Sequence, residues 1–244
     1  MKSICLVAIV IYCCYTTIVE AALPAAICLT GEFHKAKPGP ETSNYTACHL
    51  YKTNTCCTAA FTEQLSKNPI RKIGNFSWNN CGDFGPKCQA YLKEVECFYQ
   101  CSPNVGYWKG AYQGSFAKVP LCGKFCDSWF DACRNENTCA KNWIMDFKMN
   151  SYGENSCNGT CKTFAAVYGD GKGLCESMWG DSFVYKIHKV DNDCMHLNSS
   201  NADVVTVNTK VAERFKSIGS HEFCPQFEKF FMAVMIFAFS LNLF

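Results

Sequence analysis

Aromatic side chains are the residues of this 244-residue chain that give the clearest indication of what it could bind. The chain contains five tryptophans and eleven tyrosines. Trp78 and Trp129 stand close to cysteines and are expected in the core. Because disulfide bonds can supply much of the stability of a secreted domain, the other rings are free to line a cavity. Such rings stack on flat heteroaromatic ligands, so the composition favours a binding protein.

The sequence lacks the motifs that accompany enzymatic catalysis. There is no G-x-S-x-G turn, no H-E-x-x-H motif and no phosphate-binding glycine loop. The segment Gly169–Gly173 resembles a glycine loop only in its composition, and it predicts a surface turn. No nucleophile paired with a base is evident. We therefore expect no enzyme activity, no catalytic residue and no cofactor.

Cysteine is the second informative residue type, with 20 copies. Such a density suits an oxidising compartment, where thiols are used in disulfides. The close spacings are of the C-x3-C kind rather than paired C-x2-C, and the five histidines are scattered, so no metal site is expected. The formal net charge of +2 gives no sign of a nucleic-acid partner.

The two ends of the chain carry targeting signals that are expected to be removed. Residues 1–21 predict a secretory signal peptide, with Lys2 ahead of the apolar run Leu6–Ile11 and small residues up to Ala21.

The C-terminal segment predicts a glycosylphosphatidylinositol (GPI) attachment signal. Residues Phe230–Phe244 are almost entirely apolar, and the polar spacer Ser220–Lys229 precedes them. Ser217 and Gly219 are small residues at the positions that such an attachment site requires. We expect the anchor on Ser217 and the removal of residues 218–244, with a buried C-terminal helix as the alternative.

Removal of both ends leaves sixteen cysteines, from Cys28 to Cys194, an even number that is consistent with eight disulfides. Four N-x-S/T sequons agree with passage through the secretory pathway. Their asparagines are Asn44, Asn75, Asn158 and Asn198. The protein is therefore expected on the extracellular face of the plasma membrane, held only by its lipid anchor, or secreted if the anchor is not added.

The remaining residues, 22–217, show no linker or repeat and predict one disulfide-rich α+β domain with several helices and short strands. Helices are expected over 55–67, over 88–101 and from Pro120 through 133, and a strand over 182–189. Cys175 and Trp179 are expected one turn apart on a further helix. On the helix that begins at Pro120, one face would be fastened to neighbouring segments. That face carries Cys122, Cys126, Trp129 and Cys133.

Eight runs of residues, most of them anchored by cysteines, resemble the folate receptor and riboflavin-binding protein family from Cys28 to about Cys194. They are His34–Glu41, Phe61–Pro69, Ser77–Gly82, Glu96–Asn104, Val119–Cys133, Asn142–Phe147, Gly153–Cys157 and Cys175–Phe183. The resemblance implies a folate receptor-like fold and a pairing scheme for all sixteen cysteines. That scheme joins Cys28–Cys56, Cys48–Cys97, Cys57–Cys101, Cys81–Cys161, Cys88–Cys133, Cys122–Cys194, Cys126–Cys175 and Cys139–Cys157.

The resemblance also implies a ligand. In riboflavin-binding proteins of this family the isoalloxazine ring lies between a tyrosine and a tryptophan, which are present here as Tyr99 and Trp179. Folate receptors carry an aspartate at the position of Val95, and a histidine and a tryptophan within the stretch that reads Ile144–Phe147 here. We therefore expect riboflavin or a related flavin as a bound ligand, not as a catalytic cofactor.

Trp108, Trp143 and Ser182 are the further ligand-binding residues that we expect. Two alternatives remain at this point. The chain could be a folate-binding receptor, or a ligand-less cell-surface member of the egg–sperm type, whose partner would be another surface protein. The presence of both Tyr99 and Trp179 favours the flavin.

Overall fold

The computed structural model describes residues 27–41, 45–187, 193–197 and 204–222, with side chains as far as Phe215. The expected signal peptide, the sequon asparagines Asn44 and Asn198 and the chain from residue 223 onward lie outside the described residues. Two described short 3-10 helices are η1 (His49–Tyr51) and η2 (Val105–Trp108).

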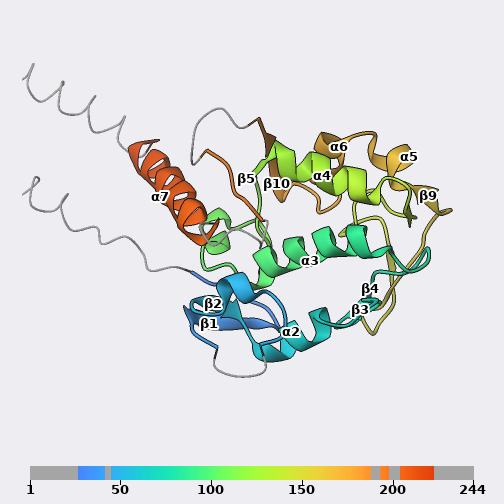
Figure 1. Cartoon of the computed structure of the whole chain (residues 1–244), viewed down its shortest axis with the longest axis horizontal. Helices are drawn as coiled ribbons and strands as arrows, with labels where there is room; N and C mark the ends of the chain where they lie inside the picture. Colours follow the sequence, from blue (N-terminus) through green and yellow to red (C-terminus); the bar gives the residue numbers. More distant parts are fainter. Residues whose placement is uncertain (1–26, 42–44, 188–192, 198–203, 223–244) are drawn as a thin grey trace, which may run out of the picture.

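Helix α3 (Pro86–Cys101) lies at the centre of the fold, and helix α4 (Gly123–Cys133) runs beside it (Figure 1). The smaller helices are α2 (Ala59–Leu65), α5 (Phe164–Tyr168) and α6 (Gly171–Cys175), and α7 (Val204–Glu222) extends at one end of the molecule. The mixture of helices and short strands confirms the α+β prediction.

The predicted helix over 88–101 is confirmed as α3. Pro86 occupies its first turn, where a missing N–H leaves no hydrogen bond unmade. Most of its circumference is buried, because other segments surround it on several sides.

Two predicted helix starts are wrong. Residues Thr55–Cys57 form strand β2, which pairs with β1 (His34–Gly39), and helix α2 starts only at Ala59. Pro120 lies in strand β5 (Val119–Cys122), and α4 begins after it at Gly123. Proline fits this strand because its carbonyl, rather than an N–H, makes the contact, accepting from the Met195 N–H at 2.7 Å.

The described strands pair into five two-stranded sheets. Strand β10 (Phe183–Lys186) fulfils the prediction of a strand within 182–189, and it runs parallel to β5, with Phe183 opposite Val119. The others are β3 (Lys72–Ile73) with β4 (Phe76–Ser77), β6 (Asn137–Thr138) with β9 (Lys162–Thr163), and β7 (Lys148–Met149) with β8 (Asn155–Ser156). Sheets this small need support from elsewhere in the fold.

Disulfides supply that support. The structure contains eight, in the same pairs that the family resemblance implies. They close loops of 18 to 80 residues, and each such closure restricts the unfolded chain by roughly 3–4.5 kcal/mol in the chain-entropy account. Helix α4 and the residue before it are fastened to three other segments, through Cys122–Cys194, Cys126–Cys175 and Cys133–Cys88.

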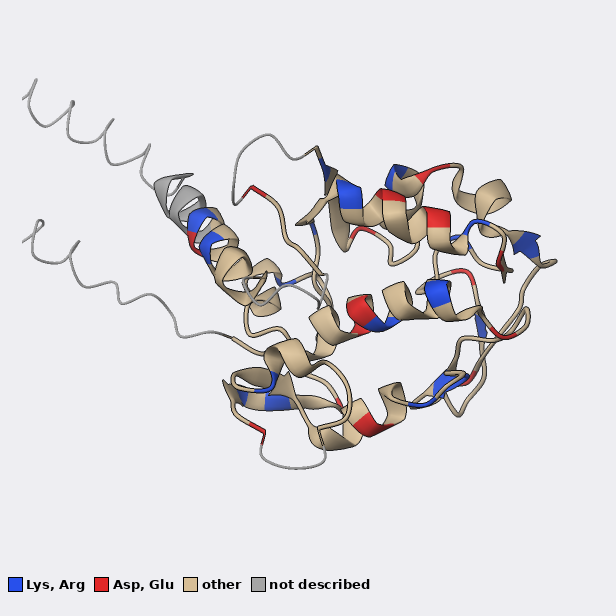
Figure 2. Cartoon of the chain, viewed as in Figure 1, with Lys and Arg blue, Asp and Glu red and all other residues tan. Residues whose placement is uncertain are grey.

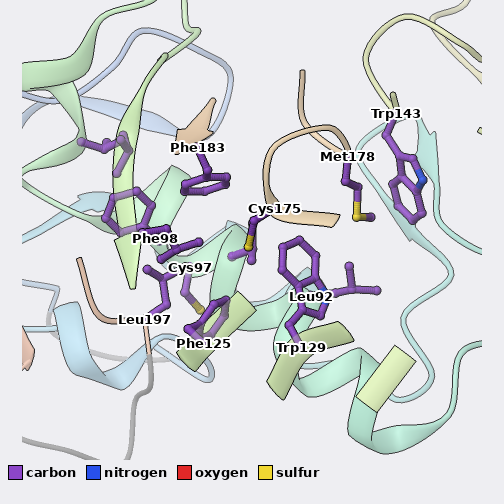
Figure 3. Packing of buried hydrophobic residues seen from close by; sticks show 14 of the residues in the cluster. Leu92, Cys97, Phe98, Phe125, Trp129, Trp143, Cys175, Met178, Phe183 and Leu197 are labelled. Carbon is purple, nitrogen blue, oxygen red and sulfur yellow. The ribbon is translucent and has the colours of Figure 1, made fainter. Parts of the chain in front are cut away.

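The core is built from aromatic and aliphatic side chains of many segments, and Figure 3 shows part of it. Leu92 and Trp129 fill the space between α3 and α4, while Phe98 contacts Phe183 of β10 at a ring distance of 6.2 Å. Trp78 and Trp129 are both buried, which confirms their assignment to the core.

The segment Gly169–Gly173 is not a simple surface turn, contrary to the prediction. The Asp170 carboxylate accepts from the Gly173 N–H (2.6 Å), and this contact caps the start of α6. Gly171 is buried against α4, where an added Cβ would overlap Asp127. Tight packing of α6 on α4 therefore explains glycine at this position.

Among the described residues, no helix combines the length and the apolar character needed to cross a bilayer. Acidic and basic side chains are interspersed over the described elements (Figure 2).

Candidate ligand-binding site

Tyr99 is the first of the two predicted stacking residues, and it lies near the C-terminal end of α3. Its ring is partly buried, with Phe116 at a ring distance of 5.7 Å and the His34 ring edge-on at 5.3 Å. Its hydroxyl donates to the Gly114 carbonyl at 3.0 Å. Burial, reinforced by the nearby Glu96 carboxyl, raises the pKa of the Tyr99 hydroxyl to about 12, so the ring stays neutral and electron-rich at physiological pH.

Trp179 is the second of the predicted stacking residues, and it lies in the turn that follows α6. We predicted one helix for Cys175 and Trp179, but α6 ends at Cys175, and Gly180, with φ of +61°, redirects the chain directly after Trp179. The Met178 N–H still donates to the Leu174 carbonyl at 3.0 Å. The Cys126–Cys175 disulfide therefore fixes the backbone a few residues before the indole.

The Trp179 ring belongs to an aromatic group that comes from three separate segments. Trp143 lies 5.6 Å from it and Phe76 of β4 lies 6.5 Å from it, measured between ring centroids. Phe147 contacts both Trp143 and Phe76. The indole Nε1 of Trp179 is buried and has no hydrogen-bond partner among the described residues.

Trp143, a further residue predicted for the ligand site, packs against Trp179. It is 1% exposed, and its Nε1 donates to the Thr138 hydroxyl at 3.1 Å. Its backbone N–H donates to the Met178 carbonyl at 2.7 Å, which joins the two loops. Figure 3 shows Met178 beside the Trp143 ring.

The segment Ser182–Phe183 connects the surroundings of the two stacking residues. The buried Ser182 donates its backbone N–H to the Trp179 carbonyl at 3.3 Å. The next residue, Phe183, contacts Phe116 at 5.1 Å, and Phe116 in turn contacts Tyr99. The predicted residues Tyr99, Trp179 and Ser182 are thus linked through a short series of direct contacts.

Trp108, the remaining predicted site residue, belongs elsewhere. It is 2% exposed, and its ring lies 4.8 Å from that of Phe215 on α7. Its described contacts hold α7 against η2, and none joins the group around Trp179. Its indole Nε1 is buried and has no hydrogen-bond partner among the described residues.

A polar cavity of about 650 Å³ lies beside the turn that contains Trp179, although neither Trp179 nor Tyr99 lines it. We call it the polar cavity; it is lined by Lys118, Lys141, Asn142, Asp146, Glu176, Ser177, Gly180, Asp181, Phe183 and Val184. Ser177 and Gly180 flank Trp179 in the chain, and Asn142 precedes Trp143. Three carboxylates and two ammonium groups line it, so it offers many hydrogen-bonding groups and a small negative excess.

The family resemblance places polar folate contacts at Val95 and within 144–147, where most of the side chains here are apolar. Val95 is buried in α3. Ile144 and Met145 are exposed, at 56% and 73%. The Asp146 carboxylate is occupied locally, accepting from the backbone N–H groups of Lys141 and Asn142.

Two polar side chains near Tyr99 were not predicted from the sequence. His34 Nε2 donates to the Tyr99 carbonyl at 3.2 Å, and burial lowers the pKa of its imidazole. Glu96 is 8% exposed, and burial raises the pKa of its carboxyl to about 7. Glu96 lies three residues before Tyr99 on the predicted helix, and this spacing was the available signal, because such residues share a helix face.

The described residues bring potential metal ligands together in two places. Both consist of disulfide sulfurs, Cys81 with Cys157 and Cys161, and Cys122 with Cys194 beside His196. A sulfur in a disulfide is not the thiolate that binds zinc.

Comparisons with known proteins show the family to which this chain belongs. The model of the folate receptor family matches residues 27–196, so the chain belongs to the folate receptor family. It is 40% identical to a riboflavin-binding protein of Gallus gallus over 187 residues, covering 76% of each chain. A riboflavin-binding protein of Dromaius novaehollandiae is 39% identical over the same length, again 76% of each chain. A folate receptor gamma of Homo sapiens is 36% identical over 164 residues, 64% of this chain and 66% of the receptor.

Proposed function

We propose that this protein is an extracellular riboflavin-binding protein or receptor that sequesters or transports the vitamin. In this proposal the isoalloxazine ring stacks between Tyr99 and Trp179. The main observation behind this proposal is that both rings are present and partly buried, and that each contacts other aromatic side chains. A phenol and an indole are electron-rich, and the flavin ring is electron-poor, so stacking on both faces is favourable.

The polar cavity supports a flavin over a folate. The ribityl chain of riboflavin is uncharged and rich in hydroxyl groups, which suits a cavity lined by carboxylates, amides and lysines. Folate carries a dianionic glutamate tail, which would meet the three carboxylates of this cavity. Val95 adds no acid for the pterin ring.

We propose the same processing and display that the sequence predicts. The signal peptide would span residues 1–21, the mature domain 22–217 and the removed propeptide 218–244, with a GPI anchor on Ser217. Asn75 and Asn158 are exposed, as glycan acceptors must be. The backbone of Ser217 lies in α7.

Equilibrium dialysis of the purified protein against riboflavin and folate tests the proposal. We expect tight binding of riboflavin at one per chain and weak binding of folate. If folate binds more tightly than riboflavin, the flavin assignment is wrong. If the folded protein binds neither vitamin, the ligand-less interaction protein of the same family is the better reading.

A further inference from the structure

Glu96 is a buried acid that makes no hydrogen bond or ion pair with any described residue. It lies on α3 and is 8% exposed, and burial raises the pKa of its carboxyl to about 7. Buried carboxyl groups in proteins are normally hydrogen-bonded or paired with a cation, because an unpaired one is costly.

The same helix contains a buried polar side chain that does form hydrogen bonds. Gln89, two turns earlier and 2% exposed, accepts from the Ile70 N–H at 2.7 Å and donates to the Phe84 carbonyl at 3.3 Å. Gln89 therefore has a clear structural role, in binding the loop that precedes α3. Glu96 has no equivalent contact with any described residue.

Two further unpaired acceptors lie on or against the same part of α3. Gln100 follows Glu96 by one turn, and its buried Oε1 has no hydrogen-bond partner. His34 donates through Nε2 to the Tyr99 carbonyl, which leaves Nδ1 as an acceptor, and this atom is also buried and unpaired. Tyr99 itself lies between Glu96 and Gln100 in the chain. The Glu96 carboxyl is close enough to the Tyr99 hydroxyl to influence its pKa, so a ligand on the Tyr99 ring that carries a hydrogen-bond donor would give Glu96 the partner that it lacks among the described residues.

We propose that Glu96 is a ligand-binding residue of the stacking site, and that its carboxyl hydrogen-bonds the imide edge of the flavin. This inference rests on the proposed function. The imide edge presents one N–H between two carbonyl groups. A carboxylate accepts from that N–H, and a protonated carboxyl both accepts from it and donates to a neighbouring carbonyl.

The assignment gives a physical reason for a change of ligand within one fold. The acid that folate receptors carry at the position of Val95 is replaced here by an acid one residue later. One residue along a helix rotates the side chain by roughly 100°. The acid would then form its hydrogen bonds with a different edge of a flat ring stacked on Tyr99.

The test measures binding of riboflavin and of N3-methylriboflavin, which lacks the imide N–H. Both are titrated into the full chain and into Glu96→Leu, Glu96→Gln and, as a matched control, Glu94→Gln. Glu94 is an acid on the same helix, roughly 160° away around its axis. Melting temperatures establish that each variant is folded.

For the wild type and Glu94→Gln we expect N3-methylation to weaken binding by roughly tenfold or more. Glu96→Gln keeps an acceptor and should retain this discrimination, whereas Glu96→Leu should bind riboflavin roughly tenfold or more weakly and lose the discrimination. If Glu96→Leu binds riboflavin as the wild type does, or still discriminates, the role of Glu96 is refuted. Absence of riboflavin binding by the folded wild type would instead overturn the proposed function, and this inference with it.

Discussion

At the scale of single residues, the main question is whether Trp179 stacks on a ligand or only fills the core. Its ring rests on Trp143 and Phe76 but is less buried than Trp143, and its Nε1 has no partner. A ring held on one side by others is available for stacking on the other.

Replacing Trp179 with alanine should therefore weaken riboflavin binding while the domain stays folded. The loss of one stacking partner costs about 1–3 kcal/mol, or roughly 5- to 150-fold in affinity. Trp129→Ala is the control, since its ring is fully buried and its loss should cost about 3–5 kcal/mol of folding stability. Fluorescence titration and thermal melting are measured on the same preparations. Normal affinity with a strongly lowered melting temperature in Trp179→Ala would assign this ring to the core.

Glu96 should make the stability of the unliganded protein depend on pH. Its pKa is about 7 in the folded protein against an ordinary value of 4.5, so the folded state holds its proton more tightly than the unfolded state. Stability therefore falls as the pH rises from about 4.5 to about 7, and above that range the penalty reaches about 3 kcal/mol. Glu96→Gln should be more stable than the wild type at pH 8, with the difference shrinking towards pH 4.5. Urea unfolding at several pH values measures it, and parallel curves for the two proteins would contradict this account of Glu96.

At the scale of elements, the disulfide between α4 and α6 is expected to pre-organise Trp179. Cys126 and Cys175 join these helices, and the turn after Cys175 presents the indole. Binding is stronger when the receptor is already ordered, because less conformational freedom is lost.

Replacing Cys126 and Cys175 together by serine should lower both the unfolding free energy, by about 2–4 kcal/mol, and the affinity for riboflavin. The matched control is the double serine variant of Cys28 and Cys56, a disulfide that joins the N-terminal segment to β2. It should lose stability while keeping its affinity under conditions where it remains folded. Equal losses of affinity in both variants would argue against a specific role for the α4–α6 disulfide.

The elements also show where sequence reasoning succeeds and where it stops. Helix α3 was predictable because its apolar positions recur at helical intervals. The start of α4 was not, because Pro120 is compatible both with a first helical turn and with a strand that uses only its carbonyl. The positions of Trp143 and Trp108 depend on contacts with Met178 and Phe215, which are distant in the sequence.

The candidate site likewise contains residues that the sequence could predict and residues that it could not. Tyr99 and Trp179 could be chosen from a family resemblance that names their positions. For Glu96 the sequence offers only its helical spacing from Tyr99, and the lack of a partner among the described residues, which motivates the proposed role, is visible only in three dimensions. The even count of sixteen cysteines predicted eight disulfides, but it did not determine their pairing.

At the scale of the whole molecule, α7 connects the folded domain to the proposed membrane anchor. Asn208 exchanges two hydrogen bonds with the His196 backbone, and the Phe215 ring stacks near Trp108. Ser217 follows Phe215 by two residues, so an anchor there would lie close to the packed part of the helix.

We expect phosphatidylinositol-specific phospholipase C to release the protein from the surface of cells that express the full chain. The reason is the small residues at 217 and 219, followed by a polar spacer and an apolar end. Flow cytometry before and after treatment measures release, with a transmembrane receptor on the same cells as the control. Surface protein that resists the enzyme would contradict the anchor but leave the binding site untouched.

The central claim is that a flavin stacks between Tyr99 and Trp179, and quenching of riboflavin fluorescence tests it most directly. An indole or phenol in contact with the excited flavin donates an electron to it, so emission from bound riboflavin should be strongly reduced. Titration of riboflavin with the purified full chain should give a linear loss of emission that ends at one flavin per protein, and excess folate should not restore it. Riboflavin emission that stays unchanged while the protein is shown to be folded would contradict the account.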